Sequence, residues 1–406
     1  MHQRAPLVTL VSLLLAACAT REPIVTPVPE TEEPVVEETA AVEPTPAPLT
    51  AEQLAAERKA RQSCARVTFA AVGDIMLGTD YPKNHLPDDD GIGFLAEVTP
   101  VLSAADLAFG NLEGVLMDGG EPVKKCKNPD ACYLFRSPAR YAGHLASAGI
   151  DVVSLANNHA RDFGEEGRTA SMMALDVAAI RHSGRVGDIA SWQHGEWSVA
   201  VIAFAPFNNS YPMLELDTAA AEVARLADRH DLVVVSFHGG AEGVDADRVP
   251  FTTERYYGED RGDVVQFAHT VIDSGADLVI GHGPHVPRAM ELYRERLVAY
   301  SLGNFATYYG ISVSGAKGYA PILLATLDAT GRFLEGEVVS TIQIRPGGPM
   351  LDQHKRAYRM IRFLTEQDFP GGRIQFLDDG RFLSGGASIA RCSDPMATDV
   401  DRAAPE

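Results

Sequence analysis

The feature that most constrains the fold of this chain is a series of short apolar segments, each followed by glycine and polar side chains. The segment 277–280 runs into the sequence GHGPH, which contains His282 and His285, and the segment 297–300 runs into SLGN, which ends at Asn304. Short apolar runs bounded by glycine predict strands buried on both faces. Because ligands bind beyond the carboxyl ends of such strands, we expect these side chains to meet at one edge of a sheet.

The same arrangement recurs at four places upstream. Segment 67–72 precedes Asp74, 106–109 precedes Glu113, 150–155 precedes Asn157, Asn158 and His159, and 231–237 precedes His238. Helices are predicted between strands at 139–148, 165–182, 218–229 and 262–274, and antiparallel strands are predicted at 320–327 and 333–344. The alternation of strands and helices predicts an α/β fold, in the form of a sandwich.

The side chains at these strand ends are of the types that bind metals. Carboxylates, amides and imidazoles are the donors that hold Mn²⁺, Fe or Zn²⁺, and one or two such ions can polarise an ester or amide oxygen. The sequence therefore predicts a metal-dependent hydrolase. The alternative for His282 and His285 is that they cap a turn and bond to backbone carbonyls. Serine chemistry is disfavoured because no Gly-x-Ser-x-Gly elbow follows a strand, and a nucleotide P-loop is absent from the sequence.

Six motifs in this order resemble those of a known family. They are Gly73-Asp-Ile-Met-Leu-Gly78, Asn111-Leu-Glu113, Asn157-Asn-His-x-x-Asp162-x-Gly164, His238-Gly-Gly-x-Glu242, Gly281-His-x-Pro-His285 and Ser301-Leu-Gly-Asn-Phe305. The family is CapA, the poly-γ-glutamate capsule biosynthesis proteins, which are related to the calcineurin-like metallophosphoesterases. The resemblance covers about residues 67–328. It implies a four-layer αββα sandwich with a metal site along one edge of the sheets.

The resemblance also implies roles for individual residues. The implied metal ligands are Asp74, Glu113, Asn158, His238, His282 and His285, with Glu113 as the candidate bridge between two ions. His159 resembles the histidine that protonates the leaving group, and Asp162 would orient it. The residues expected to contact substrate or to support the ligands are Asn157, Arg136, Glu242 and Asn304. Two positions depart from the family, which often has histidine in place of Gly283 and an aromatic residue in place of Gly239.

The N-terminus predicts export and lipid attachment. Arg4 precedes a short apolar segment that ends in Leu-Ala-Ala-Cys18, which resembles the cleavage motif of bacterial lipoproteins. The alternative is an ordinary signal peptide with an incidental cysteine. We expect a signal peptide at 1–17, a proline- and glutamate-rich linker at 18–63, the folded domain at 64–395 and a disordered tail at 396–406. The implied location is extracytoplasmic, on the periplasmic side of the outer membrane or on the cell surface.

Four further cysteines are predicted to form disulfides in that oxidising location. Four cysteines allow three connectivities, and we favour Cys126–Cys132 with Cys64–Cys392. Their spacing matches no zinc-binding pattern.

The charge of the chain bears on its partners. A formal net charge of −20 disfavours general nucleic-acid binding. Lys124, Lys125 and Lys127 form either a solvated loop or a cationic lip for an anionic substrate. The predicted substrate is a phosphoester or an anionic polymer. The alternatives are a non-catalytic accessory subunit that assembles with capsule or polyglutamate synthase subunits at the membrane, and a general phosphoesterase.

Overall fold

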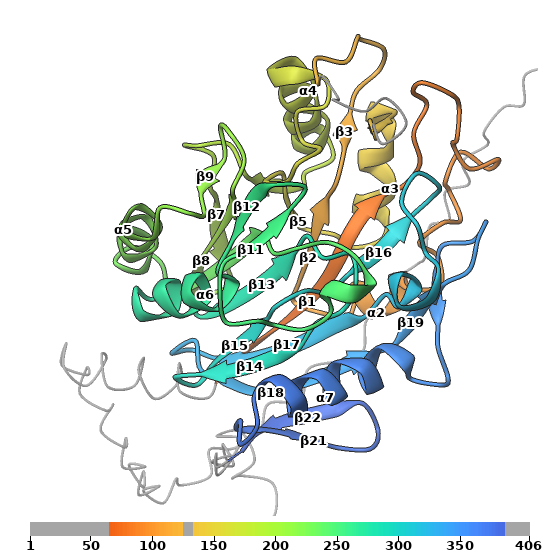
Figure 1. Cartoon of the computed structure of the whole chain (residues 1–406). Coiled ribbons are helices and arrows are strands. Elements are labelled where there is room, and N and C mark those ends of the chain that lie inside the picture. Colours follow the sequence, from red (N-terminus) through yellow and green to blue (C-terminus); the bar gives the residue numbers. More distant parts are fainter. Residues whose placement is uncertain (1–64, 125–132, 386–406) are drawn as a thin grey trace, which may run out of the picture. The chain divides into compact units, whose positions relative to one another are not determined.

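The computed structural model describes residues 65–124 and 133–385 of the 406-residue chain. Within them, nine strands form the first of two large sheets (Figure 1). These strands are β1 (Arg66–Met76), β2 (Leu107–Leu112), β5 (Val152–Ser154), β6 (Arg181–Ser183), β16 (Asn304–Thr307), β17 (Ile322–Asp328), β18 (Phe333–Val339), β21 (Ile374–Phe376) and β22 (Arg381–Ser384). The strands β1, β2, β5 and β6 run parallel, and β16 also runs parallel to β1. The strands β17, β18, β22 and β21 extend the sheet in antiparallel fashion from the other side of β1.

The second sheet has seven strands in the described part of the chain. These are β7 (Ala190–His194), β8 (Trp197–Ala205), β9 (Tyr211–Pro212), β10 (Leu232–His238), β13 (Leu278–His282), β14 (Met290–Tyr293) and β15 (Arg296–Ala299). Its centre, β8-β10-β13-β15, is parallel, whereas β7 and β14 are antiparallel edge strands. Three two-stranded ribbons complete the strands: β3 (Val115–Leu116) with β4 (Arg136–Ser137), β11 (Glu254–Tyr256) with β12 (Glu259–Gly262), and β19 (Thr341–Gln343) with β20 (Pro349–Leu351).

Helices cover the outer face of each sheet. They are α2 (Thr99–Leu102), α3 (Ala142–Ser147), α4 (Gly164–Val177), α5 (Leu216–Ala227), α6 (Val264–Asp273) and α7 (Arg356–Asp368). Short 3₁₀ turns lie at Ala139–Tyr141, Val244–Ala246 and Gly315–Gly318. The first sheet packs against α2, α3 and α4, the second packs against α5 and α6, and α7 contacts β14 and β18.

The core shows why two sheets form four layers. In β1, Phe69 and Ala71 pack with the second sheet, whereas Ala70 and Val72 face the helices. Successive side chains of a strand point to opposite faces, so a fully apolar strand is buried on both. Strand β10 divides its side chains in the same way. The αββα sandwich that the sequence predicted is confirmed by these layers.

Two predicted elements differ in the structure, and one helix was not predicted. The helix expected at 165–182 ends at Val177, and Arg181–Ser183 is instead the edge strand β6. The turn between them is made by Ala179, which has a φ of 59° although it is not glycine. The strand expected at 333–344 divides into β18 and β19. The helix α7 was not predicted at all.

Several predictions fall outside the described residues. These are the signal peptide at 1–17, the linker at 18–63, the tail at 396–406, lipidation at Cys18 and the disulfides of Cys64, Cys126, Cys132 and Cys392. No helix among the described residues has the length and apolar composition needed to cross a bilayer.

Candidate metal centre

The carboxyl ends of strands from both sheets meet at one edge. In the first sheet, β1 and β2 are parallel, and after a shift in register that follows Ala71, Asp74 lies beside Asn111. In the second sheet, β10 and β13 place His238 beside His282. All four side chains are fully buried. The sequence stretches that carry them therefore converge from distant parts of the chain.

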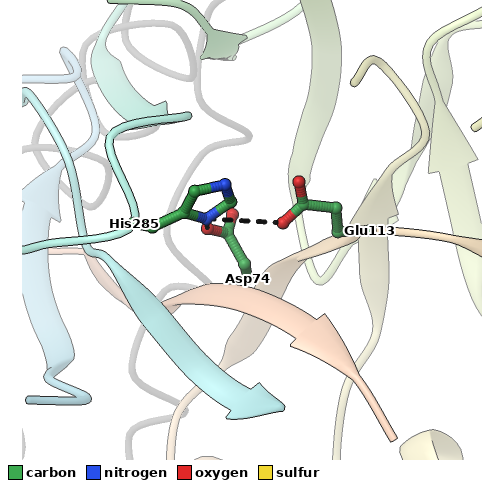
Figure 2. Close-up of side chains that lie close together, drawn as sticks. All are labelled: Asp74, Glu113 and His285. Carbon is green, nitrogen blue, oxygen red and sulfur yellow. Dashed lines mark hydrogen bonds and ion pairs between the residues drawn. The ribbon is translucent and has the colours of Figure 1, made fainter. Parts of the chain in front are cut away.

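Three side chains of this edge form a compact group, which Figure 2 shows at close range. Nδ1 of His285 lies 2.9 Å from Oδ2 of Asp74 and 3.7 Å from Oε2 of Glu113. One possible ligand atom from each of the three residues lies within 4.8 Å of the other two. His282 joins the group through Asp74, because its Nδ1 lies 3.5 Å from Oδ1 of that carboxylate.

The loop that carries His285 is held in an unusual backbone conformation. His285 has a φ of 60°, in the left-handed region that non-glycine residues adopt rarely. Asn304 fixes this loop: its Oδ1 lies 3.2 Å from Nδ1 of His285, and its side-chain amide donates to the carbonyls of His285, Ser312 and Lys317. The buried side chain of Asn304, in β16, therefore holds this strained loop in place and fixes the position of the His285 imidazole.

Buried polar atoms without partners surround the group. Among the described residues, no hydrogen-bond partner is found for these atoms: both carboxylate oxygens of Glu113, Oδ1 of Asn158, Nε2 of His238, and Nδ1 and Nε2 of His282. Buried polar atoms are almost always paired, so each unpaired one requires an explanation. Carboxylate, amide and imidazole atoms are ligands for divalent ions such as Mn²⁺, Fe²⁺ and Zn²⁺, so the residues present fit a metal site.

Burial and neighbouring charges set the protonation of the group. Burial raises the pKa of Glu113 to about 8. Burial alone would lower the pKa of His285, but the charges of Glu113 and Asp74 raise it to about 10. Burial likewise opposes ionisation of Asp74, yet the neighbouring imidazoles of His282 and His285 hold its pKa well below the ordinary value. Without a metal, protons on Glu113 and His285 thus neutralise the cluster.

A second group lies on the turn that follows β5. Nδ1 of His159 lies 2.7 Å from Oδ2 of Asp162, and Nζ of Lys124 lies 2.9 Å from Oδ1 of the same carboxylate. The backbone N–H of Phe135 donates to Asp162, and the Phe135 ring packs on the imidazole at 4.3 Å between centroids. Donation from Nδ1 to Asp162 leaves Nε2 as the atom of His159 that can exchange a proton.

The remaining predicted residues take different places. The side chain of Asn157 bonds to Asn111, to the carbonyl of Leu112 and to the N–H of His159, so it braces the turn. Glu242 lies 3.8 Å from Nε2 of His285. Arg136 is not brought to the ligand group, because its guanidinium bonds to Asp80 and to the carbonyl of Gly120.

Asn111 is a central residue that the sequence analysis did not assign to the site. Its side-chain nitrogen lies 2.8 Å from Oδ1 of Asp74 and 3.4 Å from Nδ1 of His238, and its oxygen accepts a bond from Asn157. It therefore orients two predicted ligands. The sequence does contain a signal that could have identified Asn111 as a site residue. It stands two residues before Glu113 on an extended strand, which puts both side chains on one face.

The two departures from the family have a local explanation. Gly283 has a φ of 116°, and a Cβ atom there would lie 2.6 Å from the carbonyl oxygen of Gly239. A Cβ atom on Gly239 would lie 2.6 Å from Sδ of Met213. The two glycines allow the ends of β10 and β13 to approach one another, so this backbone excludes larger residues at both positions.

The fold and the ligand group together define a class: an αββα sandwich with a candidate metal centre at the strand ends. The family model described as "Bacterial capsule synthesis protein PGA_cap" matches residues 68–309, and the chain belongs to this family. The CapA resemblance seen in the motifs is thereby confirmed.

Curated relatives carry related names. The chain is 25% identical over 271 residues to the capsule biosynthesis protein CapA of Bacillus anthracis, covering 59% of each chain. It is 28% identical to the PGA biosynthesis protein CapA of Bacillus subtilis, covering 58% of this chain and 61% of the relative. It is 29% identical to a probable polyglutamine synthesis accessory protein of Mycobacterium tuberculosis, covering 51% and 57%. The match thus spans less than two thirds of the length of each of these relatives.

Solved structures show distant likenesses. The NAD nucleotidase of Haemophilus influenzae has a TM-score of 0.37 at 10% identity, covering 74% of this chain and 56% of that one. A 5′-nucleotidase precursor from Thermus thermophilus has a TM-score of 0.36 at 14% identity, covering 75% and 59%.

Proposed function

We propose that the protein is a divalent-metal-dependent hydrolase or transferase of capsule or poly-γ-glutamate biosynthesis, and that it acts on a phosphoester or amide bond of an anionic cell-surface polymer. One observation carries this proposal: buried carboxylate, amide and imidazole atoms without partners surround Asp74, beside a hydrogen-bonded His159–Asp162 pair. A structural cluster would be expected to satisfy its own polar atoms.

Different residues of the chain would have different roles in the reaction. Asp74, Glu113, Asn158, His238, His282 and His285 would hold one or two ions of Mn, Fe or Zn. A bound divalent ion would act as a Lewis acid toward a phosphoryl or acyl oxygen. Asn111 and Asn304 orient the ligands, as supporting residues do in metal sites.

His159 is the proposed proton donor to the leaving group. Asp162 fixes its tautomer and ring orientation through Nδ1, which leaves Nε2 for proton transfer. Burial lowers the pKa of His159 despite the opposing charge of Asp162, so a protonated imidazole would give up its proton readily. Lys124, paired with Asp162, places a positive charge beside this site and favours an anionic substrate.

A non-catalytic role is the alternative. One relative is named as a synthesis accessory protein, and a protein of this kind would bind polymer or synthase subunits without turnover. Under this alternative, synthase subunits co-purify with the protein and capsule assembly is indifferent to His238→Gln.

The proposed location is a membrane surface outside the cytoplasm, reached through lipid attachment at Cys18. This residue lies outside the described part of the chain, so the support is the sequence motif alone. Incorporation of labelled fatty acid into the wild-type protein, and its loss in Cys18→Ser, is the expected result.

Metal analysis joined to a hydrolase screen tests the catalytic proposal. The purified protein should contain Mn, Fe or Zn, and its turnover of phosphoesters or of γ-linked glutamate oligomers should stop when a chelator is added. His238→Gln should lose both metal and turnover. His194→Gln is the matched control, since His194 lies on β7, away from the ligand group, and lies 4.0 Å from Asp106. Unchanged turnover in the chelated protein would overturn the proposal.

A further inference from the structure

Three arginines surround a single carboxylate at the start of α4. Nε of Arg161 and Nη2 of Arg168 each lie 2.6 Å from Oε1 of Glu165. Nη2 of Arg185 lies 3.2 Å from Oε2 of the same carboxylate. Asn209 also donates to Oε1 at 3.1 Å. We call Arg161, Arg168 and Arg185 the arginine cluster.

The arginine cluster carries more positive charge than its surroundings neutralise. Within residues 65–124 and 133–385, Glu165 is the ion-pair partner of all three arginines, and no second carboxylate pairs with any of them. Three guanidinium groups against one carboxylate leave an excess of two positive charges. The cluster thus has the charge that an anion would complement.

Arg168 shows the imbalance most clearly. Its side chain is fully buried, and its Nε and Nη1 have no hydrogen-bond partner among the described residues. Burial lowers the pKa of Arg168, and although Glu165 opposes this, Arg185 and Arg161 lower it further. Buried guanidinium nitrogens without acceptors are costly, because they have lost their water and gained nothing in return.

A cavity of about 430 Å³ opens beside the cluster. It is lined by Glu165, Thr169, Arg185, Val186 and Asn209. A larger hollow of about 790 Å³ on the outer face of α4 shares Glu165 and Thr169 with it. An anionic group could therefore reach Arg185 from the surface through the smaller cavity.

The cluster is joined directly to the proposed catalytic turn. Arg161 stands two residues after His159 and one before Asp162, and its Nη1 donates to the carbonyl of Asn208. A group bound by the cluster would thus be fixed relative to the imidazole by a single short turn.

We propose that the arginine cluster is a binding subsite for a second oxyanion of the substrate, a carboxylate or a phosphate, next to the bond that is cleaved. Assignment of this oxyanion to the substrate rests on the proposed function, whereas anion binding itself does not. The planar guanidinium presents paired N–H donors that match such oxyanions, which a lysine does not do. An anion that enters the smaller cavity would meet Arg185, which lines it, and would neutralise the excess charge of the cluster.

Binding measurements on the full chain test the subsite. Two probes, inorganic phosphate and a short γ-linked glutamate oligomer, are titrated calorimetrically into chelator-treated wild-type protein and into His238→Gln. Because no metal is present, binding at the metal centre does not contribute. We expect Arg185→Gln to weaken binding of the recognised probe by about tenfold or more, the effect of losing one charge-assisted hydrogen bond.

Arg140→Gln is the matched control. Arg140 lines the larger hollow but pairs with its own carboxylate, Asp90, and should bind the probe as wild type does. Arg161→Gln is a second site variant and should weaken binding as Arg185→Gln does. Preference for phosphate would identify a phosphate-bearing substrate, and preference for the oligomer would identify a carboxylate chain.

Two results would overturn the subsite. One is the absence of binding of either probe by the wild type, and the other is equal affinity in Arg185→Gln, Arg140→Gln and wild type. If metal-dependent turnover is absent but the arginine variants still lose binding, the hydrolase proposal fails and the anion site stands. If turnover is present and the arginine variants bind normally, only the subsite fails.

Discussion

The metal centre and the arginine cluster each take a residue from the turn after β5, Asn158 and Arg161 respectively, and they are built in opposite ways. Around Asp74 and Glu113, carboxylate oxygens and imidazole nitrogens of the described residues are left without hydrogen-bond partners. Around Glu165, guanidinium nitrogens are left without acceptors. The chain as a whole has a formal charge of −20, and this net value does not predict the local charge of either cluster. Local charge, set by which side chains the fold brings together, decides what each site can bind.

The two clusters also differ in whether they can change their charge by taking up protons. The metal centre can take up protons, because Glu113 and His285 both titrate with raised pKa values. The arginine cluster has no such option, since guanidinium stays protonated throughout the physiological range. Its excess charge therefore persists until an anion binds.

The largest expected effect is a loss of turnover that leaves the metal centre intact. His159→Asn should lower turnover by about 10²–10⁴-fold, the usual contribution of a positioned proton donor. Metal content should remain as in wild type, because His159 is paired with Asp162 and is not among the ligands. Single-turnover assays with metal analysis measure both. Full activity in His159→Asn would show that His159 is not the proton donor. The reason to place the substrate at this turn would then be lost.

The fold was predictable from the sequence because its signals are local. Strands β1, β10 and β13 are apolar on both faces and run into glycine and polar residues, so their position and the convergence of their ends could be inferred. The end of α4 was missed for a physical reason. The chain reverses at Ala179, an apolar residue with positive φ, and no glycine marks the turn.

Helix α7 has a local signal that the sequence analysis missed, because its buried residues Ala357, Tyr358, Ile361 and Leu364 recur at helical spacing among many charged ones. Other features depended on tertiary contacts. Asn111 lies near the end of β2, beyond the predicted segment 106–109, and its contacts with Asp74 and His238 appear only in the fold. The arginines of the cluster are separated by up to two dozen positions, and only the fold gathers them on Glu165.

A second test compares the supporting amide of each cluster. Asn111 is buried and bonds to Asp74, whereas Asn209 is exposed and bonds to Glu165. Asn111→Ala should weaken metal affinity by about 10–100-fold, as loss of a supporting residue does in metal sites. Asn209→Ala should leave metal affinity unchanged. Competition with a fluorescent chelator measures both variants, and equal affinities would show that Asn111 does not orient the ligands.

The smallest expected effect is a change of stability with pH. It is caused by proton uptake, which only the metal centre should show. In the metal-free folded protein Glu113 has a pKa of about 8 against an ordinary 4.5, and His285 has one of about 10 against 6.5. Between about pH 6 and pH 9 both groups hold more protons folded than unfolded, so stability falls as the pH rises. The lowered pKa of Asp74 acts with the opposite sign but only at acid pH, below its ordinary value of 3.8.

The free energy of unfolding of the chelated protein should therefore decline across this range, by at most about 1.4 kcal/mol per pH unit for each proton released, and the melting temperature should fall with it. Glu113→Gln should flatten the part of the decline below about pH 8, because glutamine cannot take up the proton. Arg185→Gln should keep the wild-type slope, since arginine does not titrate there. A bound divalent ion should also flatten the slope, because it replaces the protons as the positive charge of the cluster. If Arg185→Gln changed the slope as Glu113→Gln does, the two clusters would be one electrostatic unit and the contrast between them would fail.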